Sequence, residues 1–514
     1  MQAQIYSAAI LGVEAKTVEI EVTATAERDA DKAPVWILVG LPDAAIRESK
    51  ERVWNALHSS KLFLTLTRTI INLAPADLRK SGTSFDLPIA LGVIAANNLL
   101  DSDRLKGVMA IGELALNGTV RPVRGALPVA MHARRMGMKC LLVPAENATE
   151  AAAATGLTVI GVRSLAQALR FLQGTETLAP TVVNVQEMFN RTYLNVPDYL
   201  DVKGQESAKR AMVIAAAGNH HVLLFGQPGT GKSMIAKRLP GIMPPLSLDE
   251  ALEVTKIHSI AGLLDPRDGL IVQRPFRSPH HTISDAGLAG GQSIPRPGEI
   301  SLAHRGVLFL DELPEFRRNV LEVMRQPLEN GEVTISRATG TFAFPAQIML
   351  VAAMNPCPCG YYGSPNHPCK CSRFQIEAYR SRISGPLLDR IDMHIEVAPL
   401  SDELLTARRN GETSASMRAK VLAARQIQNQ RYEGTGIRDN ASLAGSALDR
   451  FCPLSQECIN ALKFVISQLQ LSARAYDRIL RVARTIADLE GGGPITPWHI
   501  NEAASYRILD RPNW

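Results

Sequence analysis

The stretch that decides the fold is a glycine-rich segment of eight residues, Gly226-Gln227-Pro228-Gly229-Thr230-Gly231-Lys232-Ser233. It matches G-x-x-x-x-G-K-[ST], the phosphate-binding P-loop. The apolar run Val222–Phe225 before it predicts a buried strand, and residues 234–239 after it are compatible with a helix. Backbone N–H groups and a helix N-terminus would then surround a phosphate. We expect Lys232 to reach the β- and γ-phosphates of ATP, and Ser233 to offer its hydroxyl to Mg²⁺.

Two further apolar strands are predicted to end in side chains that suit the same chemistry. Val307–Leu310 is followed by Asp311 and Glu312, and residues 348–354 are followed by Asn355. We expect Asp311 to hold the Mg²⁺ shell, and Glu312 to orient and activate the attacking water. An acidic pair after an apolar strand is common, but after a P-loop the combination is specific. Asn355, taken alone, is better explained as a turn residue at a strand end.

Length and composition are those of a soluble globular protein with several domains. The chain has 514 residues, of which 46% are hydrophobic and 21% charged. A net charge of +6 and a pI near 8.9 fit a polyanionic partner only weakly, because Lys and Arg are spread along the chain. Aromatic residues make up 5%, which argues against a large base-stacking platform.

The sequence predicts a cytoplasmic protein that does not span a membrane. The N-terminus has no basic segment followed by an apolar core of signal length. No uncharged apolar stretch reaches the ~20 residues that a transmembrane helix needs. Seven cysteines, an odd number, suggest a reducing compartment.

The fold class is expected to be α/β, in four consecutive parts. These are an N-terminal α+β domain over 1–174, a linker over 175–197, a P-loop α/β core over 198–400, and a helical C-terminal part over 401–514. In the first domain, three strands and two helices are predicted from apolar patterning: Val35–Val39, 69–73, 140–143, Ala44–Ser59 and 85–96.

Four of the seven cysteines lie within fifteen positions, at Cys357, Cys359, Cys369 and Cys371. Four thiolates can close a tetrahedral structural zinc site and hold the Gly- and Pro-rich loop between them. The spacing is tighter than a C-x-x-C knuckle, so two alternatives remain. His367 can replace one thiolate, or the four cysteines can be free.

The N-terminal domain resembles the proteolytic domain of Lon proteases and the similar domain of the recombination protein RadA. The resembling segments are 72–77, 81–88 and 112–128. Ser84 stands where the family has its serine nucleophile, but Pro128 stands where it has the lysine base, and proline accepts no proton. Lys139 does not match the motif position. We therefore expect an inactive protease fold kept for assembly or DNA contact.

Across its whole length the chain resembles the YifB/ComM family of magnesium-chelatase-like AAA+ ATPases. The segments 274–284, 290–291 and 295–304, which lead into Asp311, carry this likeness. The resemblance implies that Asn355 is sensor 1, that Arg390 is an arginine finger entering the neighbouring subunit's site, and that Arg474 belongs to the sensor 2 helix. It also implies that residues 201–206 pack near the adenine and that 274–298 include pore-facing loops. The arginines are otherwise compatible with surface ion pairs.

The family resemblance implies an ATP-dependent, homo-hexameric DNA helicase that drives branch migration in recombination during natural transformation. The expected partners are DNA, bound through its backbone, and further copies of the chain. The alternative is an ATPase of the chelatase or MoxR type that remodels a protein partner, and a Lon-like protease is disfavoured by Pro128. The pair His280-His281 has no third ligand at metal spacing, so we interpret it as two hydrogen-bonded polar histidines.

Overall fold

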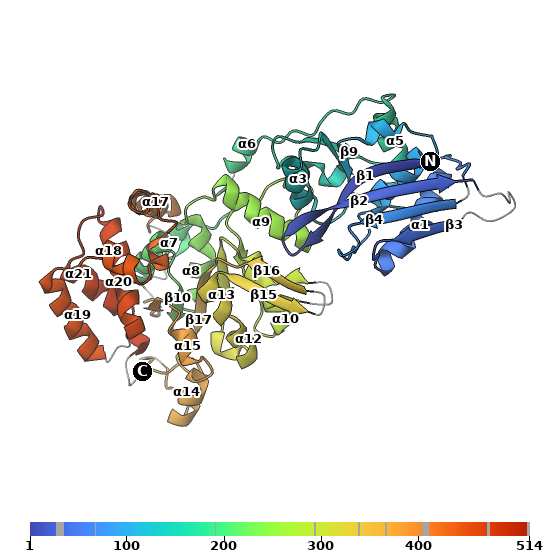
Figure 1. The fold of residues 1–514 in the computed structure, drawn as a ribbon. Helices are drawn as coiled ribbons and strands as arrows, with labels where there is room; N and C mark the ends of the chain where they lie inside the picture. The colour runs from blue at the N-terminus through green and yellow to red at the C-terminus, as the bar shows by residue number, and fades with distance from the viewer. Residues whose placement is uncertain are drawn as a thin grey trace. The chain divides into compact units, whose positions relative to one another are not determined.

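In the computed structural model of the chain, the described residues are 1–26, 35–66, 68–190, 192–291, 295–337, 340–364, 367–401, 403, 411–469 and 473–510 (Figure 1). They form two compact units. The N-terminal unit comprises Met1–Asn190, Leu248–Val272 and Ser336–Phe344. The P-loop unit comprises Arg191–Ser247, Gln273–Ile335 and Pro345–Trp514.

The N-terminal unit is built on a seven-stranded mixed sheet in the order β3-β4-β2-β1-β5-β8-β9 (Figure 1). Its strands are β1 Gln2–Leu11, β2 Glu14–Thr25, β3 Val35–Val39, β4 Arg68–Ala74, β5 Val108–Ala110, β8 Cys140–Pro144 and β9 Thr158–Val162. β2 is antiparallel to β1 and β4, whereas the remaining neighbours are parallel. Inward and outward residues alternate along β2, as expected for a sheet with one face in a core.

The helices of this unit are α1 Ala44–Ser59, α2 Asp86–Ala96, α3 Ala126–Arg135, α4 Ala148–Ala152, α5 Leu165–Gln173, α6 Val185–Phe189 and α9 Leu248–Ala261. All eleven residues of α2 are buried, so this apolar helix forms the centre of the core. α9 comes from the middle of the chain and is fixed to the unit by polar contacts. Ser259 bonds to the buried Glu150 carboxylate, and Lys256 pairs with Glu14 at 2.7 Å.

The P-loop unit contains a five-stranded, all-parallel sheet in the order β11-β14-β17-β10-β18. The strands are β10 Val222–Phe225, β11 Phe276–Arg277, β14 Val307–Leu310, β17 Met349–Met354 and β18 Met393–Glu396. Every residue of β10, β14 and β17 is buried, which is typical of strands covered on both faces.

Two groups of helices accompany this sheet. Those that alternate with the strands are α7 Glu206–Gly218, α8 Lys232–Arg238, α10 Asp285–Ala289, α11 Glu299–Leu302, α12 Arg318–Val323, α13 Arg325–Asn330, α14 Arg373–Arg380 and α15 Gly385–Leu388. The C-terminal helices are α17 Ser414–Arg431, α18 Ser446–Phe451, α19 Gln456–Leu469, α20 Ala473–Leu489 and α21 Pro497–Ser505. α17 and α20 pack on α7, so the helical part shares one core with the sheet.

Short antiparallel pairs complete the described structure. They are β6 Glu113–Leu114 with β7 Val120–Arg121, β12 Gly290–Gly291 with β13 Arg296–Pro297, and β15 Glu332–Arg337 with β16 Gly340–Pro345. The β12–β13 pair lies in the P-loop unit, within the segment where pore loops are predicted, whereas most of β16 belongs to the N-terminal unit.

The predicted elements occur where the sequence patterns placed them, with differences at particular segments. The long hairpin β1–β2 was not among the predictions, and α6 lies inside the segment predicted as a linker. The sequence predicts one continuous P-loop core over 198–400, but in the structure residues 248–272 belong to the N-terminal unit. Of the predicted helical C-terminal part, residues 402, 404–410 and 470–472 lie outside the described residues.

Candidate nucleotide site

The P-loop connects β10 to α8, in the predicted strand–loop–helix order. Gly231 caps α8 with φ of 96°, a conformation that a residue with a Cβ rarely adopts. A Cβ on Gly226 would lie 2.3 Å from the carbonyl oxygen of Val397, so the first glycine allows β18 to approach. Backbone geometry therefore demands glycine at both ends of the motif.

Lys232 is held inside the loop that it belongs to. Its Nζ donates to the carbonyl oxygens of Gly226 at 2.7 Å and Gln227 at 2.8 Å, and to Asn355 Oδ1 at 3.2 Å. Burial lowers the pKa of Lys232 to about 8, against the opposing attraction of Asp311. These contacts hold the ammonium group where an anionic ligand on the loop would meet it.

The carboxyl ends of three adjacent strands bring the predicted polar residues together. β17 pairs with β10 so that Met354 faces Phe225, and Asn355 therefore follows directly beside the P-loop. β14 pairs with the other edge of β17 and ends before Asp311. Parallel strands share one carboxyl edge, which is where ligands bind in open α/β sheets.

Ser233 and Asp311 form the pair expected of a Mg²⁺ site. Ser233 Oγ donates to Asp311 Oδ2 at 2.6 Å, and the N–H of Glu312 donates to Asp311 Oδ1 at 3.0 Å. A hydroxyl and a carboxylate are hard oxygen ligands, which Mg²⁺ prefers. The two residues therefore fit the metal that the P-loop implies.

Glu312 is exposed and has a partner that sequence reasoning missed. His281 Nδ1 lies 3.4 Å from Glu312 Oε2, and the Glu312 side chain is 54% exposed. His280 bonds instead to Thr282 Oγ1 at 2.9 Å. Both histidines thus have polar partners, as predicted, but His281 faces the expected catalytic carboxylate. In the sequence, only the position of His281 between the P-loop and Asp311 could have suggested that it lies near Glu312.

Arg390 and Arg474 lie together in a second cavity. This cavity, of about 330 Å³, is lined by four arginines and three carboxylates: Arg390, Arg474, Arg478, Arg481, Glu329, Asp389 and Asp392. A separate cavity of about 250 Å³ is lined by Gly226 and Gln227, and the two cavities share no lining residue. The predicted arginine finger and sensor 2 residue therefore share a site that is distinct from the P-loop of their own chain.

Each arginine of this cavity has its own environment. Arg390 contacts Glu329, and Arg474 lies 3.6 Å from Asp389 with 67% of its side chain exposed. Arg478 has only 14% of its side chain exposed and pairs with Asp392 at 2.5 Å. It is therefore a structural residue.

The segment expected near the adenine does contact the P-loop. Gln205 Nε2 donates to the carbonyl oxygen of Ala398 at 2.7 Å and to that of Thr230 at 3.4 Å. Gln205 precedes α7 with φ of 58°. It links the start of α7 to the loop between β10 and α8.

The serine and proline of the Lon-like resemblance lie in the N-terminal unit. Ser84 is half-buried just before α2, and its carbonyl oxygen accepts from the N–H of Gly112 at 2.9 Å. Pro128 is buried in the first turn of α3, and Lys139 is exposed. The position that would supply a base is therefore occupied by a side chain of the core that accepts no proton.

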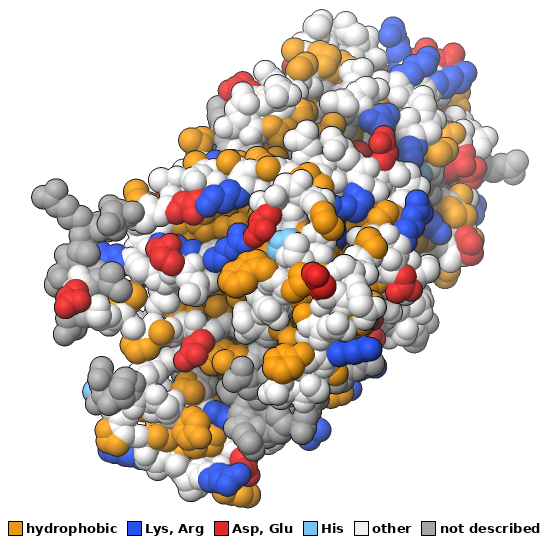
Figure 2. All heavy atoms as spheres, turned by 90° about the vertical axis from the view of Figure 1, so that its left-hand side faces the viewer, with side chains coloured by type: hydrophobic (Ala, Val, Ile, Leu, Met, Phe, Trp, Pro, Cys, Tyr) orange, Lys and Arg blue, Asp and Glu red, His pale blue; other side chains and the backbone are white. Residues whose placement is uncertain are grey.

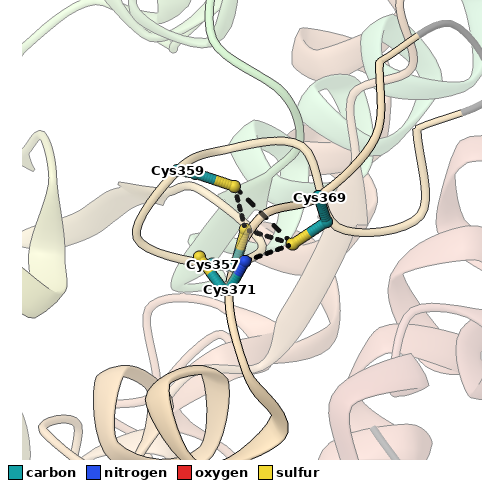
Figure 3. Close-up of side chains that lie close together, drawn as sticks. All are labelled: Cys357, Cys359, Cys369 and Cys371. Atoms are coloured by element: carbon teal, nitrogen blue, oxygen red, sulfur yellow. Dashed lines mark hydrogen bonds between the residues drawn. The ribbon is translucent and has the colours of Figure 1, made fainter.

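The four cysteines converge in one cluster (Figure 3). Their sulfur atoms all lie within 4.8 Å of one another, and His367 is not a member of the group. The His367 ring packs against Tyr361 instead, with 5.0 Å between ring centroids. The alternative in which the histidine replaces a thiolate is therefore not the arrangement found.

Three family models match the chain in succession. They are "Subunit ChlI of Mg-chelatase" over 24–147, "Magnesium chelatase, subunit ChlI" over 198–405, and "Magnesium chelatase, subunit ChlI C-terminal" over 411–507. Among the described residues, no helix is long and apolar enough to cross a bilayer.

Similar proteins cover almost the whole chain. Competence protein ComM of Haemophilus influenzae is 43% identical over 510 residues, which are 99% of this chain and 97% of that protein. YifB of Escherichia coli is 40% identical over 512 residues, with the same coverage. The magnesium-chelatase 38 kDa subunit of Cereibacter sphaeroides is 27% identical over 60% of this chain. The chain belongs to the YifB/ComM family of magnesium-chelatase-like AAA+ proteins.

Proposed function

We propose that the protein is an ATP-driven motor that acts on DNA, as a homo-hexameric ring with helicase or branch-migration activity. One observation carries the ATPase part: Lys232, Asn355 and the bonded pair of Ser233 and Asp311 meet at the carboxyl edge of one parallel sheet. The proposed cofactors are ATP and Mg²⁺, together with a zinc ion at the four cysteines.

The roles of the residues follow from their chemistry. Bound Mg²⁺ would neutralise charge on the β- and γ-phosphate oxygens. Ser233 and Asp311 would hold it, while Lys232 exchanges its carbonyl partners for phosphate oxygens. Glu312 would accept a proton from the attacking water, and Asn355 would orient that water with its amide.

Arg390 and Arg474 are proposed to complete the site of a neighbouring copy. A guanidinium stabilises the charge that develops on the transferred phosphoryl group. Both residues line a cavity that shares no lining residue with the cavity beside Gly226 and Gln227, which agrees with action on the nucleotide of another copy. A head-to-tail contact between copies generates a closed ring when its rotation closes.

The DNA part rests on the relative named competence protein ComM. Figure 2 shows acidic and basic side chains interspersed on one face of the molecule, without a large field of one sign. With a net charge of only +6, DNA binding should depend on a limited number of phosphate contacts. Affinity should still fall as salt rises, with a slope set by that number of contacts.

A second candidate is an ATPase that remodels a protein partner. It is favoured by the three magnesium-chelatase family models and by the 27% identity to a magnesium-chelatase subunit. The 38 kDa subunit matches only 60% of this chain, whereas ComM matches 99%. The full-length match makes the DNA motor the stronger proposal.

The experiment that separates the two candidates is an ATPase assay with single-stranded DNA, duplex and a four-way junction. The DNA motor predicts stimulation by at least one of these, largest at low salt and absent in Glu312→Gln. If none of the three DNAs changes the rate of ATP turnover by the wild-type protein, the result would contradict the DNA motor and favour partner remodelling.

A further inference from the structure

We propose that Cys357, Cys359, Cys369 and Cys371 bind one zinc ion in a closed site, and that this site braces the P-loop. The second part rests on the proposed ATPase function. The loop concerned, residues 356–371, follows β17 and Asn355 directly and leads into α14. The described part of this loop contains neither helix nor strand, so some other interaction must fix its path.

The sulfur positions fit a single tetrahedral ion. Cys357 and Cys359 lie 3.4 Å apart, Cys357 and Cys369 3.7 Å, and Cys359 and Cys369 3.6 Å, measured between sulfur atoms. Zinc bonded at about 2.3 Å to four sulfurs separates each pair by about 3.8 Å. The separations are too long for a disulfide, which needs about 2.05 Å. Figure 3 shows the four side chains gathered in one loop, with the sulfurs of Cys357, Cys359 and Cys369 facing one another.

Backbone donors surround the sulfurs as they do in metal sites. The N–H of Tyr362 donates to Cys357 at 3.3 Å, and that of Cys371 donates to Cys369 at 3.4 Å. The N–H groups of Tyr361 and Lys370 also donate hydrogen bonds to Cys359. Such outer partners orient ligands and stabilise thiolates. Four protein ligands leave no open position, so the site is structural and not catalytic.

The loop closed by these cysteines lies against the P-loop. Gly360, with φ of 84°, packs so tightly that a Cβ there would lie 2.5 Å from Pro228 Cγ. Ser364 Oγ donates to Gln227 Oε1 at 3.2 Å. Tyr362 and Gly363 line the same cavity as Gly226 and Gln227. The loop thus forms one wall of a cavity beside the first two residues of the P-loop.

α14 fixes the far end of the wall. Arg380 donates through Nε and Nη2 to the carbonyl oxygen of Pro356 at 3.2 and 3.1 Å, and its guanidinium lies 5.2 Å from the centre of the Tyr362 ring. The metal would tie Cys357, next to Asn355, to Cys371, next to α14. Because metal binding supplies folding free energy, loss of the ion should release the wall and weaken nucleotide binding.

The test uses the full-length protein, with metal content and nucleotide affinity measured separately. We expect one zinc per chain by elemental mass spectrometry. Cys359→Ser/Cys371→Ser should lose the zinc and bind mant-ADP about tenfold or more weakly, the range seen when a metal shell is disturbed. Cys140→Ala, which removes a thiol of β8 in the N-terminal unit, should change neither quantity.

Gly360→Ala keeps every ligand, places a Cβ against Pro228 and strains the backbone at a φ of 84°. It should retain the zinc and still weaken mant-ADP binding, which keeps the test valid if the serine variant does not fold. Iron in place of zinc, or no stoichiometric metal, would overturn the site. Normal mant-ADP affinity in zinc-free protein or in Gly360→Ala would overturn the brace. Undiminished ATP turnover by zinc-loaded Lys232→Ala would overturn the ATPase proposal and leave the metal site standing.

Discussion

Two arginines of α20 provide a comparison between a structural and a functional guanidinium. Arg478 leaves only 14% of its side chain exposed and pairs at 2.5 Å with Asp392, of which 3% is exposed. Burial would raise the pKa of Asp392, but His220 and the Arg478 charge outweigh it and hold that pKa well below its usual value. Arg478→Ala would leave this carboxylate buried without its cation, at a cost of about 3–5 kcal/mol.

Arg474→Ala is the matched control on the same helix. Its guanidinium is 3.6 Å from Asp389 and its side chain is 67% exposed, so its removal should cost about 0–1 kcal/mol. The assay is hydrogen exchange of peptides from β18 and α20, whose protection reports local opening. At about 1.4 kcal/mol per tenfold change, Arg478→Ala should lose about 100-fold or more in protection. Equal protection in the two variants would refute the assignment of Arg478 as structural.

Further predictions concern the P-loop, its acidic partner and pH. Lys232→Ala should fold normally and lose ATP turnover by about 100-fold or more, which a coupled phosphate-release assay would detect. Glu312→Gln should lower turnover by about 10²–10⁴-fold while ATP still binds, measured by equilibrium dialysis against Lys232→Ala. The exchange difference between wild type and Arg478→Ala should persist above about pH 4, where unfolded Asp392 is ionised, and shrink as the pH falls further toward its folded pKa. A difference that vanishes already at pH 6 would count against this pair.

Much of the P-loop unit was predictable because its signals are local. β10 and β14 occupy the predicted residues, and the polar side chains that follow three buried strands meet because parallel strands share one edge. The cysteine cluster was also predictable, because its four cysteines lie within fifteen positions of one loop and so need no long-range contact to meet.

What the sequence did not predict depends on contacts between distant residues. The hairpin β1–β2 was missed, although alternating residues are buried along β2. The partner of Glu312 is His281, 31 positions earlier, which no spacing rule connects. The shared cavity of Arg390 and Arg474 depends on how α20 packs near the end of α15, and periodicity along one helix carries no information about that.

The central claim is that ATP cleavage at one P-loop is completed by Arg390 of a neighbouring copy. Arg390→Ala and Glu312→Gln should each be inactive alone, because every site in either assembly lacks one essential group. After the two are mixed and reassembled, an Arg390→Ala chain next to a Glu312→Gln chain regains a complete site. At equal ratio about a quarter of the interfaces in a head-to-tail ring have this order. The account predicts that ATPase activity returns in the mixture toward this fraction of the wild-type rate. A mixture that stays inactive although the chains co-assemble, or an Arg390→Ala protein that is fully active alone, would contradict it.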